Sequence, residues 1–167
     1  MQHEMKRPRT RWMTAVLMLA FHLVCAQIGD GRMEAQPKWG VFSWNQENAK
    51  DSSAREAMLD AMVQLGISEI CQEMDSASAP SFLQRANELG LDVFLLAGRP
   101  EWGLQRNGKN MIAQIDRAAA MVSEWGDAGP RGLVLDVESY LTDEYQRNPM
   151  AAMNRFLDAL RTTYARA

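Results

Sequence analysis

Histidine is nearly missing from this 167-residue sequence, because its two copies, His3 and His22, both lie within the first 26 positions. From residue 27 onwards the chain therefore has no group for Ser-His-Asp or Cys-His catalysis, for zinc held by histidine, or for acid–base catalysis by an imidazole. Cysteine is also scarce. Cys71 is the only one beyond residue 26, which excludes an intramolecular disulfide there. Carboxylate, amide, hydroxyl, basic and aromatic groups remain for any chemistry.

Long apolar runs are missing as well. The longest covers residues 12–24, which is shorter than the ~20 residues of a bilayer-spanning helix. Basic residues precede this run, and Val24-Cys25-Ala26 ends it as a small-residue cleavage pattern. We therefore predict a secretory signal peptide over residues 1–26, a polar linker over 27–37, and a secreted or periplasmic domain over 38–167.

Three other interpretations of the first 26 residues stay open: a transmembrane anchor, a lipoprotein with its lipid on Cys25, and an unused leader before a true start at Met33. Cleavage after Ala26 would remove four basic residues and one acid, leaving 14 Lys and Arg against 20 Asp and Glu. The net charge would change from −3 to −6. An acidic chain without a basic stripe argues against nucleic acid, and against an anionic membrane, as a partner.

Short β-like runs alternate four times with amphipathic helical runs after residue 37. The predicted strands cover residues 39–44, 67–73, 91–97 and 133–138. Apolar residues at helical spacing follow each strand, and the strand at 91–97 is apolar throughout, which is typical of a strand buried on both faces. Because each unit has the length of a βα repeat, we predict an α/β domain with a parallel sheet and right-handed crossovers.

Four βα units are half of a (β/α)8 TIM-type barrel. No fifth strand pattern is found in the sequence, so a closed eight-stranded monomer is not expected. Three possibilities follow: a half-barrel that completes itself as a homodimer, a truncated gene product, or a small open sheet.

Two acids close the predicted fourth strand. Alternation along a strand directs Leu133, Leu135 and Val137 towards the helices, and directs Asp136 and Glu138 to the opposite face. Parallel βα folds place their active sites at the carboxyl ends of their strands, where two neighbouring carboxylates can divide the roles of acid and base. The structural alternative is an ion pair of these acids with Arg99 or Lys109.

The segment Arg131-Gly-Leu-Val-Leu-Asp-Val-Glu-Ser-Tyr140 resembles the fourth-strand signature of chitinase-type (family 18) glycoside hydrolases, in which a Gly-hydrophobic stretch leads to Asp-x-Glu and an aromatic residue. Together with Trp39-Gly-Val-Phe42 and Leu95-Leu-Ala-Gly-Arg-Pro-Glu-Trp102, it also resembles uncharacterised bacterial barrel proteins of glycosidase type. The resemblance extends from Trp39 to about Tyr140.

This resemblance implies hydrolysis of the O-glycosyl bonds of a polysaccharide or glycan. Glu138 would be the general acid that protonates the glycosidic oxygen, and Asp136 would hold a substrate N-acetyl group or assist that acid. The chitinase signature has two further acids upstream on the same strand, where this sequence has Arg131 and Val134. The carboxylate relay of that family is therefore incomplete here.

Five more residues at predicted strand ends are candidates for substrate binding. Aromatic rings cover the apolar face of a sugar, and polar side chains beside them fix its hydroxyl groups. Each of the aromatic residues has a simpler interpretation as core or rim packing. The candidates are Trp44, Glu73, Arg99, Trp102 and Tyr140.

Two further functions stay open beside the hydrolase. One is a non-catalytic carbohydrate-binding or truncated barrel protein. The other is a Mg²⁺- or Ca²⁺-dependent barrel enzyme with its metal on Glu73, Asp75, Asp136 and Glu138. The hydrolase hypothesis calls for no metal or other cofactor. Its partners are a carbohydrate ligand and, where half-barrels pair, a second copy of the chain.

Overall fold

The computed structural model describes residues 38–167, so the predicted signal peptide and linker lie outside the described residues. Four parallel strands form one sheet and follow each other in chain order: β1 (Gly40–Ser43), β2 (Glu69–Gln72), β3 (Asp92–Ala97) and β4 (Gly132–Leu135). The predicted α/β class and parallel sheet are confirmed, and the arrangement is consistent with half of a (β/α)8 barrel.

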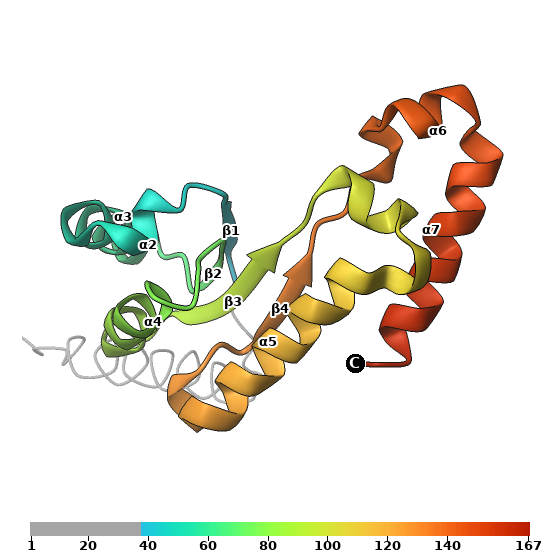
Figure 1. The fold of residues 1–167 in the computed structure, drawn as a ribbon. Helices are drawn as coiled ribbons and strands as arrows, with labels where there is room; N and C mark the ends of the chain where they lie inside the picture. Colours follow the sequence, from blue (N-terminus) through green and yellow to red (C-terminus); the bar gives the residue numbers. More distant parts are fainter. Residues whose placement is uncertain (1–37) are drawn as a thin grey trace, which may run out of the picture. The chain divides into compact units, whose positions relative to one another are not determined.

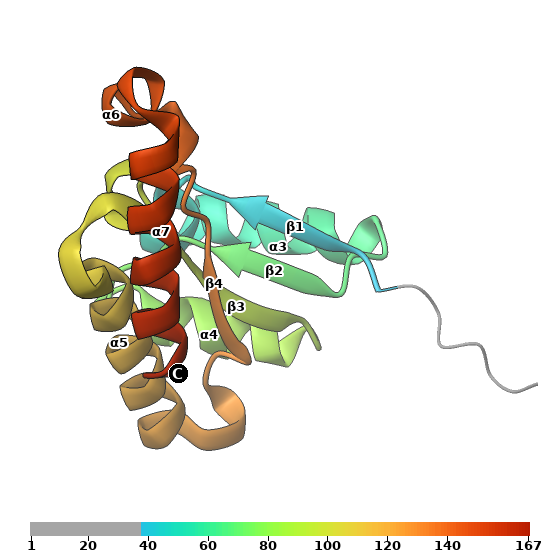
Figure 2. The same ribbon diagram turned by 90° about the vertical axis from the view of Figure 1, so that its right-hand side faces the viewer.

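Helices follow every strand. β1 leads into α2 (Glu47–Lys50) and α3 (Ser52–Gln64), β2 into α4 (Ala79–Glu88), β3 into α5 (Lys109–Trp125), and β4 into α6 (Asp143–Arg147) and α7 (Pro149–Tyr164). Short 3-10 turns complete the loops: η1 (Pro100–Leu104), η2 (Arg106–Gly108), η3 (Gly126–Ala128) and η4 (Ser139–Leu141). Figure 1 shows α3, α4, α5 and α7 following one another around one side of the sheet, and Figure 2 gives the view at right angles. Within residues 38–167, no helix combines the length and apolar character that a membrane crossing requires.

Local signals account for the ends of these helices. The Asp51 carboxylate accepts a hydrogen bond from the backbone N–H of Ala54 at 2.8 Å and so caps the start of α3. Gly66, with φ of +70°, follows the end of α3, because glycine adopts this left-handed conformation without the cost that a side chain brings. At α7, the Asn148 side chain accepts from the N–H of Ala151 at 3.2 Å, and Pro149 occupies the first turn.

The hydrophobic core lies between the sheet and helices α3 to α5. Ile70 of β2 and Leu95 of β3 are fully buried there against Leu59 and Phe82. The other face of the sheet is only partly covered by the described residues: Leu96 of β3 is fully buried on it, but its β1 end is exposed. The register aligns Phe42, Cys71, Phe94 and Gly132 in a row across this second face. Phe42 is 58 % exposed in that row.

One strand ends earlier than predicted. β4 stops at Leu135, whereas the sequence predicted a strand up to Glu138. The N–H of Asp136 still donates to the carbonyl of Ala97 at 2.9 Å, so pairing continues for one residue beyond the regular strand. Glu138 has φ −98° and ψ 64°, which leaves the extended conformation and opens the turn η4. Asp136 therefore lies at the strand end, and Glu138 lies in the loop that follows.

Candidate functional site

A cavity of about 200 Å³ opens at the carboxyl edge of the sheet, where the loops after β1, β3 and β4 meet. It brings together four of the seven residues singled out from the sequence, and Gly98 and Pro100 complete its wall. The four are Trp44, Arg99, Asp136 and Glu138. Alternation along β4 is also confirmed, since Leu133 and Leu135 line a different, apolar cavity beside α5.

The position of Asp136 depends on a close approach of two backbones. A Cβ atom built on Gly98 would lie 1.7 Å from the carbonyl oxygen of Asp136, which no real contact permits. Only glycine therefore fits at this point, immediately after β3. The sequence showed Gly98 as part of a loop, but the need for glycine comes from the neighbouring strand and is invisible without the register.

Glu138 is held by the residue two positions after it. The Tyr140 hydroxyl donates a hydrogen bond to Oε1 of Glu138. This bond raises the pKa of Tyr140 above its ordinary value, and partial desolvation and the negative charges of Glu138 and Asp136 add to the rise. Tyr140 thus acts as a positioning residue for the carboxylate, and both acids contribute to the local electrostatic field.

Arg99 connects the ends of three strands. Its Nη2 lies 2.8 Å from Oε1 of Glu73, which follows β2, and its guanidinium carbon lies 5.8 Å from the centre of the Trp44 ring, which follows β1. A cation over the face of an indole ring is attracted by the ring's quadrupole. The carboxylates of Asp136 and Glu138 take part in none of the salt bridges of residues 38–167, so the ion pair with Arg99 or Lys109 considered from the sequence is not formed.

Three residues that the sequence did not single out hold the site loops in place. Gln72 is fully buried, and its Nε2 donates to the carbonyl oxygens of Asn45 at 3.0 Å and Glu73 at 2.7 Å. The buried hydroxyl of Ser139 donates to the carbonyl of Pro100 at 2.9 Å. A Cβ on Gly103 would lie 2.2 Å from this hydroxyl, so the loops after β3 and β4 interlock.

The remaining predicted residues lie outside the cavity. Glu73 contributes through Arg99, and Trp102 is half-buried in η1 without lining the cavity wall. Asp75 accepts hydrogen bonds from the N–H and hydroxyl of Ser78, both at 2.8 Å, and these bonds lower its pKa. Among residues 38–167, no three Asp, Glu, His or Cys side chains gather in a way that could hold a metal ion. The four-carboxylate metal site considered from the sequence therefore has no geometric support.

No protein-family model, curated protein or solved structure matches this chain. The chemistry of the cavity is consequently argued from its own residues.

Proposed function

We propose that this protein is a glycoside-hydrolase-like enzyme that acts on a polysaccharide or glycan at the carboxyl edge of its sheet. The observation that carries the proposal is the cavity that Asp136 and Glu138 line together with Trp44 and Arg99. Sugar hydrolysis uses a pair of carboxylates, and an aromatic ring beside them can cover the apolar face of a sugar. The resemblance of residues 131–140 to the chitinase-type signature supports the same assignment.

The size of the cavity suits a small part of a glycan. At about 200 Å³ it is smaller than the roughly 300–1,000 Å³ of pockets that enclose a drug-sized ligand. A single sugar ring would enter, with its apolar face on Trp44 and the rest of the chain outside. Arg99, already held by Glu73, would bind a hydroxyl or an N-acetyl carbonyl oxygen without further ordering.

In this proposal Glu138 gives the proton to the leaving oxygen. Tyr140 holds its Oε1, so Oε2 is the oxygen directed to the glycosidic bond. Asp136 would stabilise the positive charge that develops at the anomeric carbon, or accept a hydrogen bond from an N-acetyl group. The N-acetyl oxygen of the substrate would attack the anomeric carbon from the opposite face as the leaving oxygen takes the proton. Water would then add to that carbon and give a proton to the Glu138 carboxylate, which restores the acid.

The test is release of reducing ends from a panel of glycans that includes chitin oligomers. Glu138→Gln should lower kcat by about a hundredfold or more, because general acid catalysis contributes 10²–10⁴. Glu101→Gln is the matched control, since Glu101 is exposed in the neighbouring turn η1 and does not line the cavity. Equal rates for the wild type and Glu138→Gln would refute the assignment.

A second function is favoured by the preformed contacts of the site. Arg99 on Trp44, and Tyr140 on Glu138, would suit a protein that binds glycan without cleaving it. Calorimetry with chitin oligomers then gives binding that Trp44→Ala abolishes and Glu101→Gln preserves, while no reducing ends appear. Binding together with product release would instead favour the hydrolase.

A further inference from the structure

We infer that two copies of this chain close into one eight-stranded barrel, in which β1 of each copy pairs with the open edge of β4 of the other. The inference rests on surfaces and register, and it holds whether or not the candidate site cleaves a glycan. It goes beyond a general expectation of pairing because it assigns the strands, the residue alignment and the side chains that meet.

One face of the sheet and the outer edge of β4 are available for contact with a second copy. All-parallel sheets are normally covered on both faces, yet the face that carries Phe42 is only partly covered among residues 38–167: Leu96 is buried on it, whereas Phe42 is 58 % exposed. The outer edge of β4 likewise has no strand partner among these residues. Exposed edges offer a row of unpaired N–H and C=O groups that promotes pairing with another strand.

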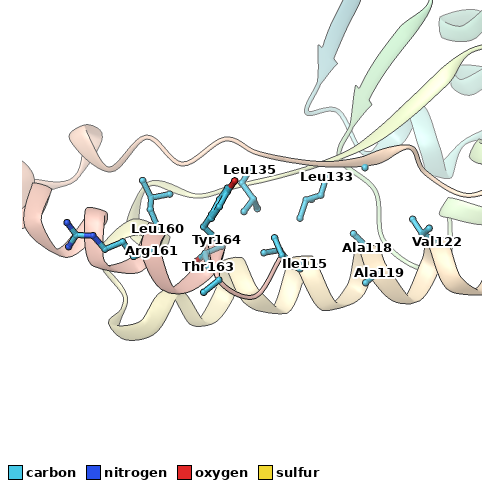
Figure 3. Close-up of a pocket in the computed structure, with 13 residues that line it drawn as sticks. Ile115, Ala118, Ala119, Val122, Leu133, Leu135, Leu160, Arg161, Thr163 and Tyr164 are labelled. Atoms are coloured by element: carbon cyan, nitrogen blue, oxygen red, sulfur yellow. The ribbon is translucent and has the colours of Figure 1, made fainter.

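An apolar cavity of about 860 Å³ lies beside this same edge (Figure 3). Leu133 and Leu135 of β4 point into it from one side, and Ile115 of α5 points into it from the other. Leu160 and Tyr164 of α7 close its far end. In a (β/α)8 barrel the helix after a strand packs over that strand and the next one. The cavity between β4 and α7 is thus where the outward side chains of a following strand belong.

The register identifies how β1 of a second copy would fit. A (β/α)8 barrel has a shear of 8 residues, so two identical halves contribute about four each. The row of aligned residues runs from Phe42 through Cys71 and Phe94 to Gly132. When this row continues into the second copy, it must therefore meet that copy's chain four positions before or after Phe42. Residues 38 and 46 are the two candidates, and they lie two positions before the start and three positions after the end of β1. We choose residue 38.

The shift from Phe42 to residue 38 has the same direction as the register offset between β3 and β4. Phe94 is the third residue of β3 and pairs with Gly132, the first residue of β4, so the register already advances by two there. We call the contact between β4 of one copy and β1 of the other the seam. A further step of two at the seam aligns Gly132 with Lys38, Val134 with Gly40, and Asp136 with Phe42 of the second copy. Leu133 and Leu135 then lie beside Trp39 and Val41 of that copy.

The side chains of β1 suit both sides of the seam. Trp39 and Val41 lie on the helix side of β1. Val41 already packs against the core of its own copy, whereas Trp39 would enter the apolar cavity of the other copy and Phe42 the barrel interior. Trp39, Phe42 and Trp44 are 65 %, 58 % and 39 % exposed. Together with Val122, Leu160 and Tyr164, they expose on the order of 600 Å² of apolar surface per copy. Each partner of a stable interface buries about 800 Å². Backbone pairing and the closed interior would add the remainder.

Closure would also complete the candidate site. The same alignment brings Phe42 of the second copy beside Asp136, where pairing along β4 still continues. Each carboxylate pair would then have an aromatic wall from both copies, and one barrel would carry two equivalent sites.

Two measurements on the full chain test the inference. Sedimentation should give the mass of two 18.8 kDa chains. Phe42→Ser should raise the dimer Kd at least tenfold, because Phe42 is exposed in the single chain and buried at the seam. Met150→Ser is the control: Met150 is 72 % exposed in the first turn of α7, does not line the apolar cavity, and should leave the Kd unchanged.

Cysteine pairs test the alignment itself. The double variant Gly40→Cys and Val134→Cys should give a covalent dimer on mild oxidation, because the aligned Cα atoms come within the ~7 Å limit of a disulfide. Within one chain, β2 and β3 separate these positions by roughly 14 Å, which excludes an internal bond.

The offset pair Gly40→Cys and Gly132→Cys should stay uncrosslinked above the background that Cys25 and Cys71 of the wild type set, since a two-residue slip puts the atoms about 8 Å apart. A wild-type monomer at all concentrations would overturn the inference, whatever segment then covers the edge. Equal crosslinking of the aligned and offset pairs would overturn it as well.

Discussion

Gly98 shows how strongly a single residue can determine the candidate site. The backbone of Asp136 passes so close that a Cβ at position 98 would overlap its carbonyl group. The backbone after β3 and the backbone after β4 are therefore in direct contact at Gly98 and Asp136. This contact fixes the backbone of Asp136, from which its carboxylate extends.

Gly98→Ala should accordingly destabilise the protein by about 2–3 kcal/mol, as expected when a well-packed site is overfilled and backbone has to move. Urea unfolding measures the loss. Gly40→Ala is the control, because a Cβ there meets the Cβ of Glu69 at 3.5 Å, an ordinary contact. Similar losses in the two variants would show that close packing at residue 98 is not the cause.

The Tyr140 hydroxyl reports on the charge of the acid pair. Its pKa is raised above 10.0 mainly by the hydrogen bond to Glu138. Glu138→Gln removes that negative charge and should bring the pKa of Tyr140 down towards its ordinary value. NMR titration of the Tyr140 ring measures the shift, with Glu144→Gln as a control of equal charge change. An unchanged Tyr140 pKa in Glu138→Gln would mean that the hydrogen bond does not persist in solution.

At the scale of elements, salt bridges connect the amino ends of the strands. Lys38 Nζ lies 3.2 Å from Glu69 and 3.1 Å from Asp92, and Arg131 Nε lies 2.8 Å from the other oxygen of Asp92. This network links the starts of all four strands. Hydrogen bonds from Arg131, and then from Lys38, lower the pKa of Asp92 below its ordinary value.

A group whose pKa is lowered by folding stabilises the protein above its unfolded pKa, here about 3.9, and loses this contribution as the pH falls through the lowered pKa. Asp92→Asn should therefore be less stable at pH 7, by about 1 kcal/mol or less for so exposed a network. The difference should vanish in strong acid. Urea unfolding across pH measures it. Asp127→Asn, whose carboxylate forms no salt bridge within residues 38–167, should follow the wild type.

The strands and long helices were predictable because their periods are local. The predicted strands at 39–44, 67–73 and 91–97 lie within two residues of the observed bounds of β1 to β3. The bend at Glu138 was not predictable, because it follows from the interlock of Ser139 with Pro100, residues 39 positions apart. The site was predictable as a set of strand ends. The roles of Gln72 and Gly98 depend on neighbours across the sheet, which a single sequence does not display.

At the scale of the whole molecule, thermal stability should depend on protein concentration if two copies close the barrel. Unfolding is then linked to dissociation, so a tenfold higher concentration should raise Tm by about 2–4 °C. Calorimetric scans over two decades of concentration measure this. Phe42→Ser should lose most of the dependence, whereas Met150→Ser should keep it. A Tm that is independent of concentration in the wild type would contradict the prediction.

The order of the strands has a kinetic consequence. Neighbours in the sheet are also neighbours in the chain, from β1 to β4, so each pairing closes only the loop of one intervening helical segment. Each closure therefore costs less entropy than the pairing of strands that are distant in the sequence would cost. Each βα unit can therefore dock as soon as it is synthesised, against an edge that already exists. Folding within a chain should be directional and first-order, and the encounter of two chains should be a separate, second-order step.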